Sequence, residues 1–227
     1  MGSTVVYSCV SGQYDNPLYT LFKSQPKTEA GVKYVLFVDD VNVVTKRGIW
    51  ELRPLAWSHA SSKRRSSRWH KLNPHILFPE AKFTVWIDGS QVIKPISIFS
   101  ELVEPYTKTV DIATFKHPIR NCVYQEIEAC KQLRKDDPAV MDKQIAFYKK
   151  IGYKPNNGMV ETSCVIRRNT EEVANFNKKW WEELESNSYR DQLSFNYVSW
   201  LCKMPYGHIP GHRAKSPFFN FVMHQRR

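Results

Sequence analysis

Residues 83–90, which read FTVWIDGS, decide the fold class, because an apolar run there ends on one aspartate and two small residues. A run that is apolar at successive positions is typical of a strand covered on both faces, as in a parallel sheet. Asp88, at its end, has two interpretations. Asp, Gly and Ser after a strand are ordinary turn formers. Alternatively, Asp88 is a carboxylate at the carboxyl end of a parallel strand, where open α/β sheets bind their ligands.

Strand-like runs of this kind recur along the chain, and segments with helix signals lie between them. Asp137 before Pro138 fits a cap followed by proline at the first helical position, and Thr170 fits a second cap. At 227 residues the chain has the length of one α/β domain. We therefore expect a single domain over residues 1–227, with a mainly parallel central sheet flanked by helices. The other strand-like runs are residues 4–12, 32–40, 110–117 and 162–169.

The net charge of +11 favours an acidic partner: nucleic acid, anionic lipid headgroups or a phosphorylated small molecule. A solvated basic surface explains the same charge. Residues 61–71, SSKRRSSRWHK, contain five Lys and Arg residues and no acid. Because residues 58–67 are rich in Ser and Arg and lack apolar periodicity, we expect a loop there. It either orders over a ligand or is plainly exposed.

The composition also indicates in which cellular compartment the protein is expected. No apolar run approaches the roughly 18–20 residues that a membrane span needs, and no basic segment precedes the short apolar one at the N-terminus. The five cysteines are scattered, without the close spacing of a zinc site. We therefore expect a soluble, cytoplasmic protein with reduced cysteines.

Four aspartates are candidate site residues. Asp39, Asp40 and Asp88 follow predicted strands, and the carboxyl ends of parallel strands meet at the edge where ligand sites gather. Each also fits an ordinary turn acid. Asp191 stands with Gln192 at a predicted helix start, where an aspartate equally fits a cap.

A second group of candidates lies in residues 206–219, YGHIPGHRAKSPFF. Histidine is a frequent metal ligand, and lysine is a point charge that suits a diphosphate. His208, His212 and Lys215 are therefore candidates for a metal and phosphate site. A plain surface loop is the alternative interpretation.

Four blocks, in this order, resemble the glycosyltransferase-like domain of plant mucilage-related Golgi proteins and their bacterial and viral relatives. The resemblance extends from about Val5 to the C-terminus. It implies a GT-A type fold, that of nucleotide-diphospho-sugar transferases. It also implies transfer of a hexose from a nucleotide sugar, UDP favoured, to a glycan or glycoprotein acceptor. The blocks are HKLNPHILFPEAKFTVWIDGS (70–90), FKHPIRNCVYQEIEAC (115–130), SCVIRRN (163–169) and YRDQLSFNYVSW (189–200).

The resemblance also implies a metal site. In GT-A enzymes a D-x-D motif after a central strand holds Mn²⁺ or Mg²⁺ on the donor diphosphate. Asp88 matches the first aspartate, whereas Ser90 stands at the second, after Gly89. One carboxylate and one hydroxyl bind a hard cation less well than two carboxylates. The resemblance to a closing H-x-x-G motif implies His208 as a further ligand, with His212 as the alternative.

Further site residues follow from the same resemblance. Residues 191–196, DQLSFN, are similar to a D-Q and L-N helix of retaining sugar transferases. This implies Asp191 and Gln192 beside the donor sugar or acceptor, with Asp191 a general base in an inverting enzyme or an orienting group in a retaining one. The remaining implied donor contacts are positive charge from Arg68, Lys71 and Lys215, and base or ribose contacts from Asp39 or Asp40.

Two alternatives remain open at this point. Ser90 in place of an aspartate also fits a non-catalytic relative that binds carbohydrate. The charge of +11 fits a nucleic-acid-binding or nucleic-acid-modifying protein, whose affinity would fall steeply with salt.

Overall fold

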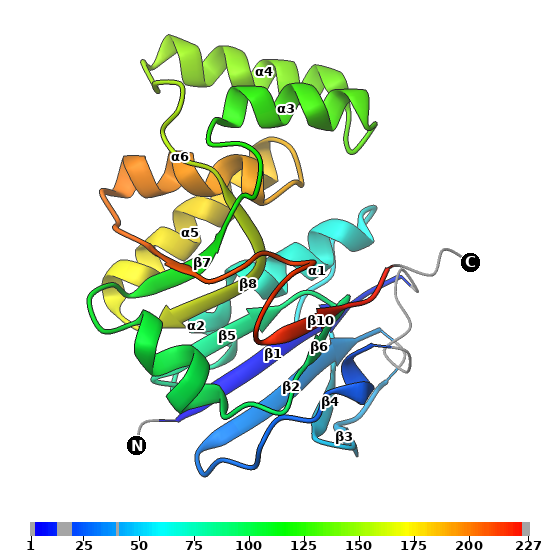
Figure 1. Cartoon of the computed structure of the whole chain (residues 1–227). Helices are drawn as coiled ribbons and strands as arrows, with labels where there is room; N and C mark the ends of the chain where they lie inside the picture. The colour runs from blue at the N-terminus through cyan, green and yellow to red at the C-terminus, as the bar shows by residue number, and fades with distance from the viewer. Residues whose placement is uncertain (1–2, 13–19, 40, 224–227) are drawn as a thin grey trace.

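The computed structural model describes residues 3–12, 20–39 and 41–223. Within these residues one eight-stranded sheet forms the centre of the molecule, in the order β3-β4-β2-β1-β5-β8-β7-β9 (Figure 1). A second, antiparallel pair is formed by β6 (Gln91–Ile93) and β10 (Phe219–Phe221). The strands of the large sheet are β1 (Thr4–Val10), β2 (Val32–Val38), β3 (Thr45–Arg47), β4 (Trp50–Pro54), β5 (Phe83–Ile87), β7 (Ile112–Lys116), β8 (Val160–Arg168) and β9 (Gly207–Ile209).

The sheet is parallel from β4 through β2 and β1 to β5, whereas β3 at its edge runs antiparallel to β4 and the other half is mixed. β1 pairs in parallel with β2 and β5, as expected for the predicted parallel sheet. β2 also pairs in parallel with β4, a strand that the sequence did not predict. β8, which we expected in the same parallel series, runs antiparallel to both β5 and β7. Its central residues are buried without interruption. A continuous apolar run therefore indicates that a strand is covered on both faces, and it says nothing about the strand's direction.

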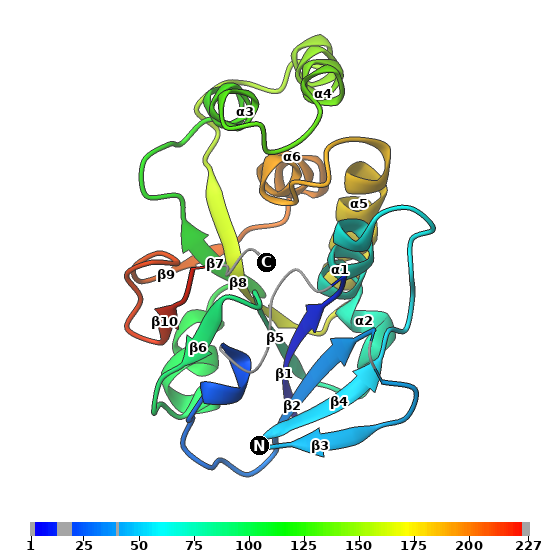
Figure 2. The same ribbon diagram turned by 90° about the vertical axis from the view of Figure 1, so that its right-hand side faces the viewer.

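Helices cover one face of the sheet in two layers. α1, α5 and α6 lie against it, and the α3–α4 hairpin lies outside α6 (Figures 1 and 2). The opposite face is covered by the β6–β10 pair and by short helical turns. The helices are α1 (Lys63–Leu72), α2 (Pro74–Leu77), α3 (Val123–Gln132), α4 (Pro138–Lys150), α5 (Glu171–Ser186) and α6 (Gln192–Cys202); the turns are η2 (Leu21–Lys23), η3 (Ile98–Val103) and η4 (Glu104–Tyr106).

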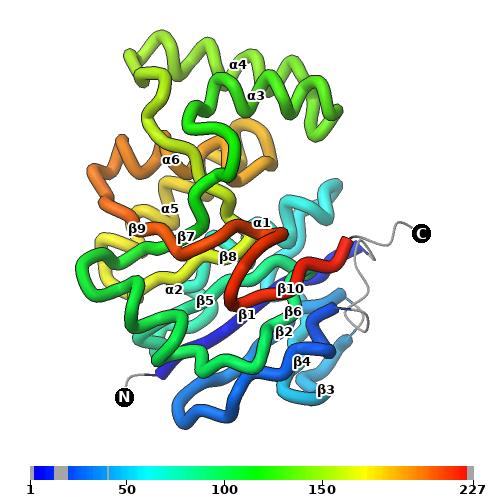
Figure 3. The backbone as a smooth tube through the Cα atoms, in the orientation of Figure 1, coloured from blue at the N-terminus to red at the C-terminus, as the bar shows by residue number. Residues whose placement is uncertain are grey.

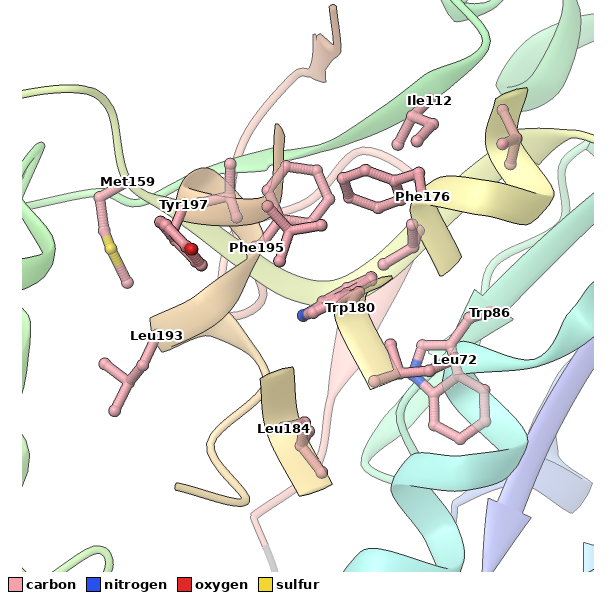
Figure 4. Close-up of a cluster of buried hydrophobic side chains, with 14 of the residues drawn as sticks. Leu72, Trp86, Ile112, Met159, Phe176, Trp180, Leu184, Leu193, Phe195 and Tyr197 are labelled. Atoms are coloured by element: carbon pink, nitrogen blue, oxygen red, sulfur yellow. The ribbon is translucent and has the colours of Figure 1, made fainter. Parts of the chain in front are cut away.

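The two faces carry separate cores. Trp86 of β5 belongs to the apolar cluster on the helix side, together with Trp180 of α5 and Phe195 of α6 (Figure 4). Val85 and Ile87 point to the other face. After α6 the chain crosses back along β7 as β9 and ends beside β6 as β10 (Figure 3). No helix among the described residues is long and apolar enough to cross a membrane.

Helix starts follow the sequence signals in two cases and depart from them in a third. Asp137 and Thr170 each cap a helix through the side chain, as predicted. Residues 58–67, expected as a loop, instead contain the start of α1, where the Ser62 side chain accepts a hydrogen bond from the N–H of Arg65. The buried side of α1 is largely polar and includes Lys71. Apolar periodicity is therefore a poor guide to this helix.

Candidate functional site

Asp39 and Asp88 lie at the same edge of the sheet. Each directly follows a parallel strand, β2 or β5, and both strands pair with β1. Oδ2 of Asp39 accepts a hydrogen bond from the N–H of Gly12 at 2.8 Å and lies 3.2 Å from Nζ of Lys63. Burial alone would raise the pKa of Asp39, but these partners hold it below its ordinary value. Asp40 lies outside the described residues.

Asp88 is a turn residue that also presents its carboxylate. Its carbonyl oxygen accepts a hydrogen bond from the N–H of Gln91 at 2.9 Å, which closes a turn through Gly89 and Ser90 into β6. Oδ1 accepts a hydrogen bond from Nε1 of Trp86 at 2.7 Å, and the side chain is 28% exposed. The turn uses the backbone, so it leaves the carboxylate available to a ligand.

Asp191 lies on the helix side of the same edge and is almost fully buried. It does not cap α6 through its side chain. Its Oδ1 lies 2.9 Å from Nε of Arg68, and its Oδ2 lies 2.5 Å from Nζ of Lys71 and accepts a hydrogen bond from Thr162 Oγ1 at 2.6 Å. Burial alone would raise the pKa of Asp191, but the charges of Arg68 and Lys71 hold it far below its ordinary value.

Lys71 joins the two aspartates. Its side chain is 1% exposed, and Nζ lies 3.6 Å from Oδ1 of Asp88 as well as 2.5 Å from Oδ2 of Asp191. The ammonium also donates to the carbonyl oxygen of Thr162 at 2.6 Å. On the backbone side, the Tyr7 hydroxyl donates to the carbonyl oxygen of Lys71 at 2.9 Å. β1, β5, β8 and α6 therefore all contribute to the position of this ammonium.

A third cation lies behind this pair. Arg167 of β8 is fully buried, and its Nη1 donates to the Tyr7 hydroxyl at 3.0 Å. Its Nε and Nη2 make no hydrogen bond within the described residues. Burial lowers the pKa of Arg167, while the charge of Asp191 opposes that shift. Arg68 and Lys71 therefore contact Asp191 directly, and Arg167 acts on the same carboxylate at longer range. Buried charge is costly, and strongly perturbed groups of this kind cluster at functional sites.

Glu161 belongs to this region but is not among the residues that the sequence predicts. Its Oε1 lies 3.1 Å from Nε of Arg213, and its Oε2 accepts a hydrogen bond from the N–H of Arg213 at 3.0 Å. Burial raises the pKa of Glu161, Arg213 and His212 lower it, and the charge of Asp88 raises it. Glu161 is therefore within electrostatic reach of both Asp88 and His212. The sequence feature that could have identified Glu161 is an acidic residue within the otherwise buried strand β8.

Gln192 takes part in a neighbouring cluster. Its Nε2 donates to Oε1 of Glu126 at 2.8 Å, away from the carboxylate of Asp191. Glu126 is buried and also accepts a hydrogen bond from Nε of Arg120 at 2.5 Å. His117 Nε2 lies 3.4 Å from the same carboxylate. The block at residues 115–130 therefore forms a polar cluster beside the Asp88–Asp191 site.

His208 lies far from Asp88 across the sheet. It pairs with Thr114 of β7, and Thr114 pairs with Val165 of β8. Val165 in turn pairs with Trp86 of β5, so three strand spacings, about 14 Å, separate His208 from β5. The His208 side chain is exposed and contacts the ring of Tyr206. The structure does not bring His208 and Asp88 together.

His212 and Lys215 form a tight turn around Arg213, whose N–H donates to Glu161. Their backbone N–H and carbonyl groups exchange two hydrogen bonds of 3.0 Å. Gly211 has φ +83°, and a Cβ there would lie 2.1 Å from the Lys215 carbonyl oxygen, so the turn requires glycine. Lys215 itself is exposed.

The described residues contain no preformed three-ligand site for a divalent metal. Among them, no group of three or more His, Cys, Asp or Glu side chains is arranged to hold a metal ion. Asp88 is already approached by the Lys71 ammonium, and His208 lies on the far side of β7. The pair of Asp88 and His208 that the resemblance implies is therefore not assembled, and the alternative ligand His212 stays a prediction.

Comparison with known proteins gives a family. Residues 1–209 match the TOD1/MUCI70, glycosyltransferase-like domain. The probable hexosyltransferase MUCI70 of Arabidopsis thaliana is 31% identical over 191 residues, which cover 75% of this chain and 32% of that protein. The alkaline ceramidase TOD1 of the same plant is 29% identical over 203 residues, which cover 76% of this chain and 43% of that protein. The chain spans less than half the length of these relatives. It belongs to the TOD1/MUCI70 glycosyltransferase-like domain family.

Proposed function

We propose that the chain is a glycosyltransferase domain that moves a hexose from a nucleotide-sugar donor, UDP favoured, to a glycan or glycoprotein acceptor. The observation that supports this best is the buried cluster of Arg68, Lys71, Asp88 and Asp191 at the carboxyl edge of the parallel strands. This edge is where α/β sheets bind nucleotides. Its two cations balance its two carboxylates, and the buried Arg167 behind it adds one further positive charge, which suits a diphosphate.

Fixed cations assist this reaction at the leaving group. When the bond from the sugar to the diphosphate breaks, negative charge grows on the departing nucleoside diphosphate. Cations held in place before the reaction stabilise that charge without reorganising. Arg68 is the more exposed of the two α1 cations at Asp191, with 22% of its side chain accessible. We assign Arg68 to direct contact with the diphosphate. Lys71, which is almost fully buried, supports that site from beneath through Asp191 and Asp88.

The two aspartates take different roles in this proposal. Asp191 is 5% exposed, and both of its carboxylate oxygens have charged or hydroxyl partners. A carboxylate whose pKa is held this low is a poor general base, so Asp191 acts as a positioning residue for Arg68 and Lys71. Asp88 is the more exposed carboxylate and contacts a hydroxyl of the donor sugar or ribose.

Mn²⁺ or Mg²⁺ at Asp88 stays a prediction from the resemblance. The proposed roles of Arg68, Lys71 and the two aspartates involve no metal. Asp39, which is bound to Lys63 beside the end of β1, is assigned to the nucleoside.

The first prediction concerns Asp88. In Asp88→Asn we expect nucleoside diphosphate release from a UDP-hexose to slow by about 10²-fold or more, because the donor loses a charged contact that helps orient it. The fold should persist, since the turn at residue 88 uses the backbone. Coupled detection of released UDP needs no identified acceptor. Asp142→Asn on α4, a charge change in an exposed ion pair, is the matched control.

Calorimetric titration with UDP, GDP and their sugar conjugates identifies the donor class by its affinity. Each titration is run once with EDTA and once with Mn²⁺. Full activity in Asp88→Asn would remove this residue from the site. Because one relative is named an alkaline ceramidase, a fluorescent ceramide belongs in the same panel. Ceramide hydrolysis without binding of any nucleotide would contradict the transferase proposal.

A further inference from the structure

Lys71 occupies the position of a bridging cation between two carboxylates. Its ammonium lies 2.5 Å from Oδ2 of Asp191 and 3.6 Å from Oδ1 of Asp88. Asp88 follows the central strand β5 and Asp191 precedes α6, so one charge connects the two halves of the site. A divalent ion between the same oxygens would have the same electrostatic role.

The ammonium is fixed in this position. Its side chain is 1% exposed, and its third partner is the carbonyl oxygen of Thr162 at 2.6 Å. The Tyr7 hydroxyl holds the carbonyl oxygen of Lys71, and Arg167 holds that hydroxyl. An almost fully buried ammonium with short contacts to Asp191 and Thr162 does not swing out to solvent when a ligand arrives.

A metal ion bound to Asp88 would be repelled by the Lys71 ammonium. One oxygen of Asp88 accepts a hydrogen bond from Nε1 of Trp86 and faces the ammonium. A divalent cation on the carboxylate would therefore lie close to Lys71, and like charges in a partly buried site repel strongly. Ser90, which stands where the D-x-D motif has its second aspartate, adds no carboxylate to offset this repulsion.

We propose that Lys71 supplies the positive charge that a divalent ion supplies in metal-dependent sugar transferases, so that the donor binds this site without added metal. Arg68, one helical turn earlier on α1, shares Asp191 with Lys71 and is the more exposed of the two cations. The inference rests on the proposed function for its ligand, a nucleoside diphosphate.

The wild-type protein tests this directly. UDP, or whichever nucleotide proves to bind, is titrated by calorimetry after treatment with EDTA and again with Mn²⁺. We expect dissociation constants that agree within about threefold. Mn²⁺ electron paramagnetic resonance should show no ion bound by the protein alone. Binding that appears only with Mn²⁺ would overturn the role of Lys71 while leaving the transferase proposal intact.

Lys71→Met removes the ammonium and keeps most of the side-chain volume. Asp88 and Asp191 then lose the cation between them, although Arg68 still contacts Asp191. We therefore expect the variant to gain a Mn²⁺ signal and to bind UDP more tightly with Mn²⁺ than with EDTA. Lys179→Met on α5, which breaks an exposed pair with Glu182, is the control and should match the wild type.

The remaining outcomes are also decisive. A Lys71→Met variant that binds UDP as the wild type does, with or without metal, would show that the ammonium is not required. If that variant does not fold, the wild-type titrations still decide between the two cations. Failure of every nucleotide to bind the wild type under both conditions would count against the proposed function itself.

Discussion

The two aspartates at the centre of the site differ in how their negative charge is compensated. Asp88 and Asp191 both contact Lys71, but only Asp191 also contacts Arg68, and its side chain is 5% exposed against 28% for Asp88. Removal of a deeply buried partner leaves its counter-charges without compensation. Removal of a partly exposed one is offset by water. The two carboxylates should therefore respond differently to the same substitution.

Asp191→Asn should lower the free energy of unfolding by about 3–5 kcal/mol, because it leaves two cations beside a neutral amide. Asp88→Asn should lower it by about 1 kcal/mol or less, since water reaches that carboxylate. Urea unfolding followed by circular dichroism measures both. Equal losses in the two variants would contradict the difference in burial on which their roles depend.

The pH dependence of Asp191 has a defined sign. Its pKa is lower in the folded protein than in the unfolded chain, where it is near 3.8. As the pH falls through that value the unfolded chain takes up the proton first, so the stability that Asp191 contributes is present at neutral pH and is lost in acid. Unfolding free energies of Asp191→Asn should consequently decline less steeply than those of the wild type below pH 4, the region in which unfolded aspartates protonate.

At the scale of elements, α1 is the helix that builds the site. It is capped by Ser62 and ends beyond Lys71, and its buried side carries polar groups into the charge cluster. His70 shows how such a helix is anchored: its Nε2 accepts a hydrogen bond from the N–H of Ala56 at 3.0 Å, while Nδ1 lies 2.8 Å from the Ser66 carbonyl oxygen. This arrangement requires the neutral imidazole, with the proton on Nδ1.

Protonation of His70 should therefore loosen α1. Burial lowers the pKa of His70 from 6.5 to about 4. Between these values the unfolded chain binds a proton that the folded protein does not, so stability falls as the pH is lowered from 6.5 to 4. The loss reaches about 3 kcal/mol. His70→Gln should flatten this part of the curve of unfolding free energy against pH. An unchanged slope would mean that His70 does not titrate in this way.

At the scale of the whole molecule, charge is divided between a buried cluster and an exposed surface. The net charge is +11, yet the cations nearest Asp191 are largely or fully buried. Salt screens exposed charges far more than buried ones. Binding at the buried site and binding to the exposed basic surface should therefore differ in their dependence on ionic strength.

Donor affinity should fall by less than about tenfold from low to high salt, because the charges at Asp191 are shielded from the solvent. Affinity for non-specific DNA should fall by about 10³-fold or more if the basic surface binds it through many phosphates. Parallel titrations of UDP and a DNA duplex compare the two. A donor affinity that collapses like that of DNA would place the nucleotide on the exposed surface.

The sequence by itself determined the α/β class, the order of the family blocks and the placement of Asp39 and Asp88 after strands. These features are local: an apolar run, a cap or a turn residue is visible in a few neighbouring positions. Only the tertiary structure decided that β8 is antiparallel, that Glu161 faces Arg213 and that His208 lies three strands from β5. It also decided that Lys71 lies between Asp88 and Asp191, residues 17 and 120 positions away along the chain. Contacts between residues so distant in sequence depend on how strands pair and helices pack, and no local pattern records that.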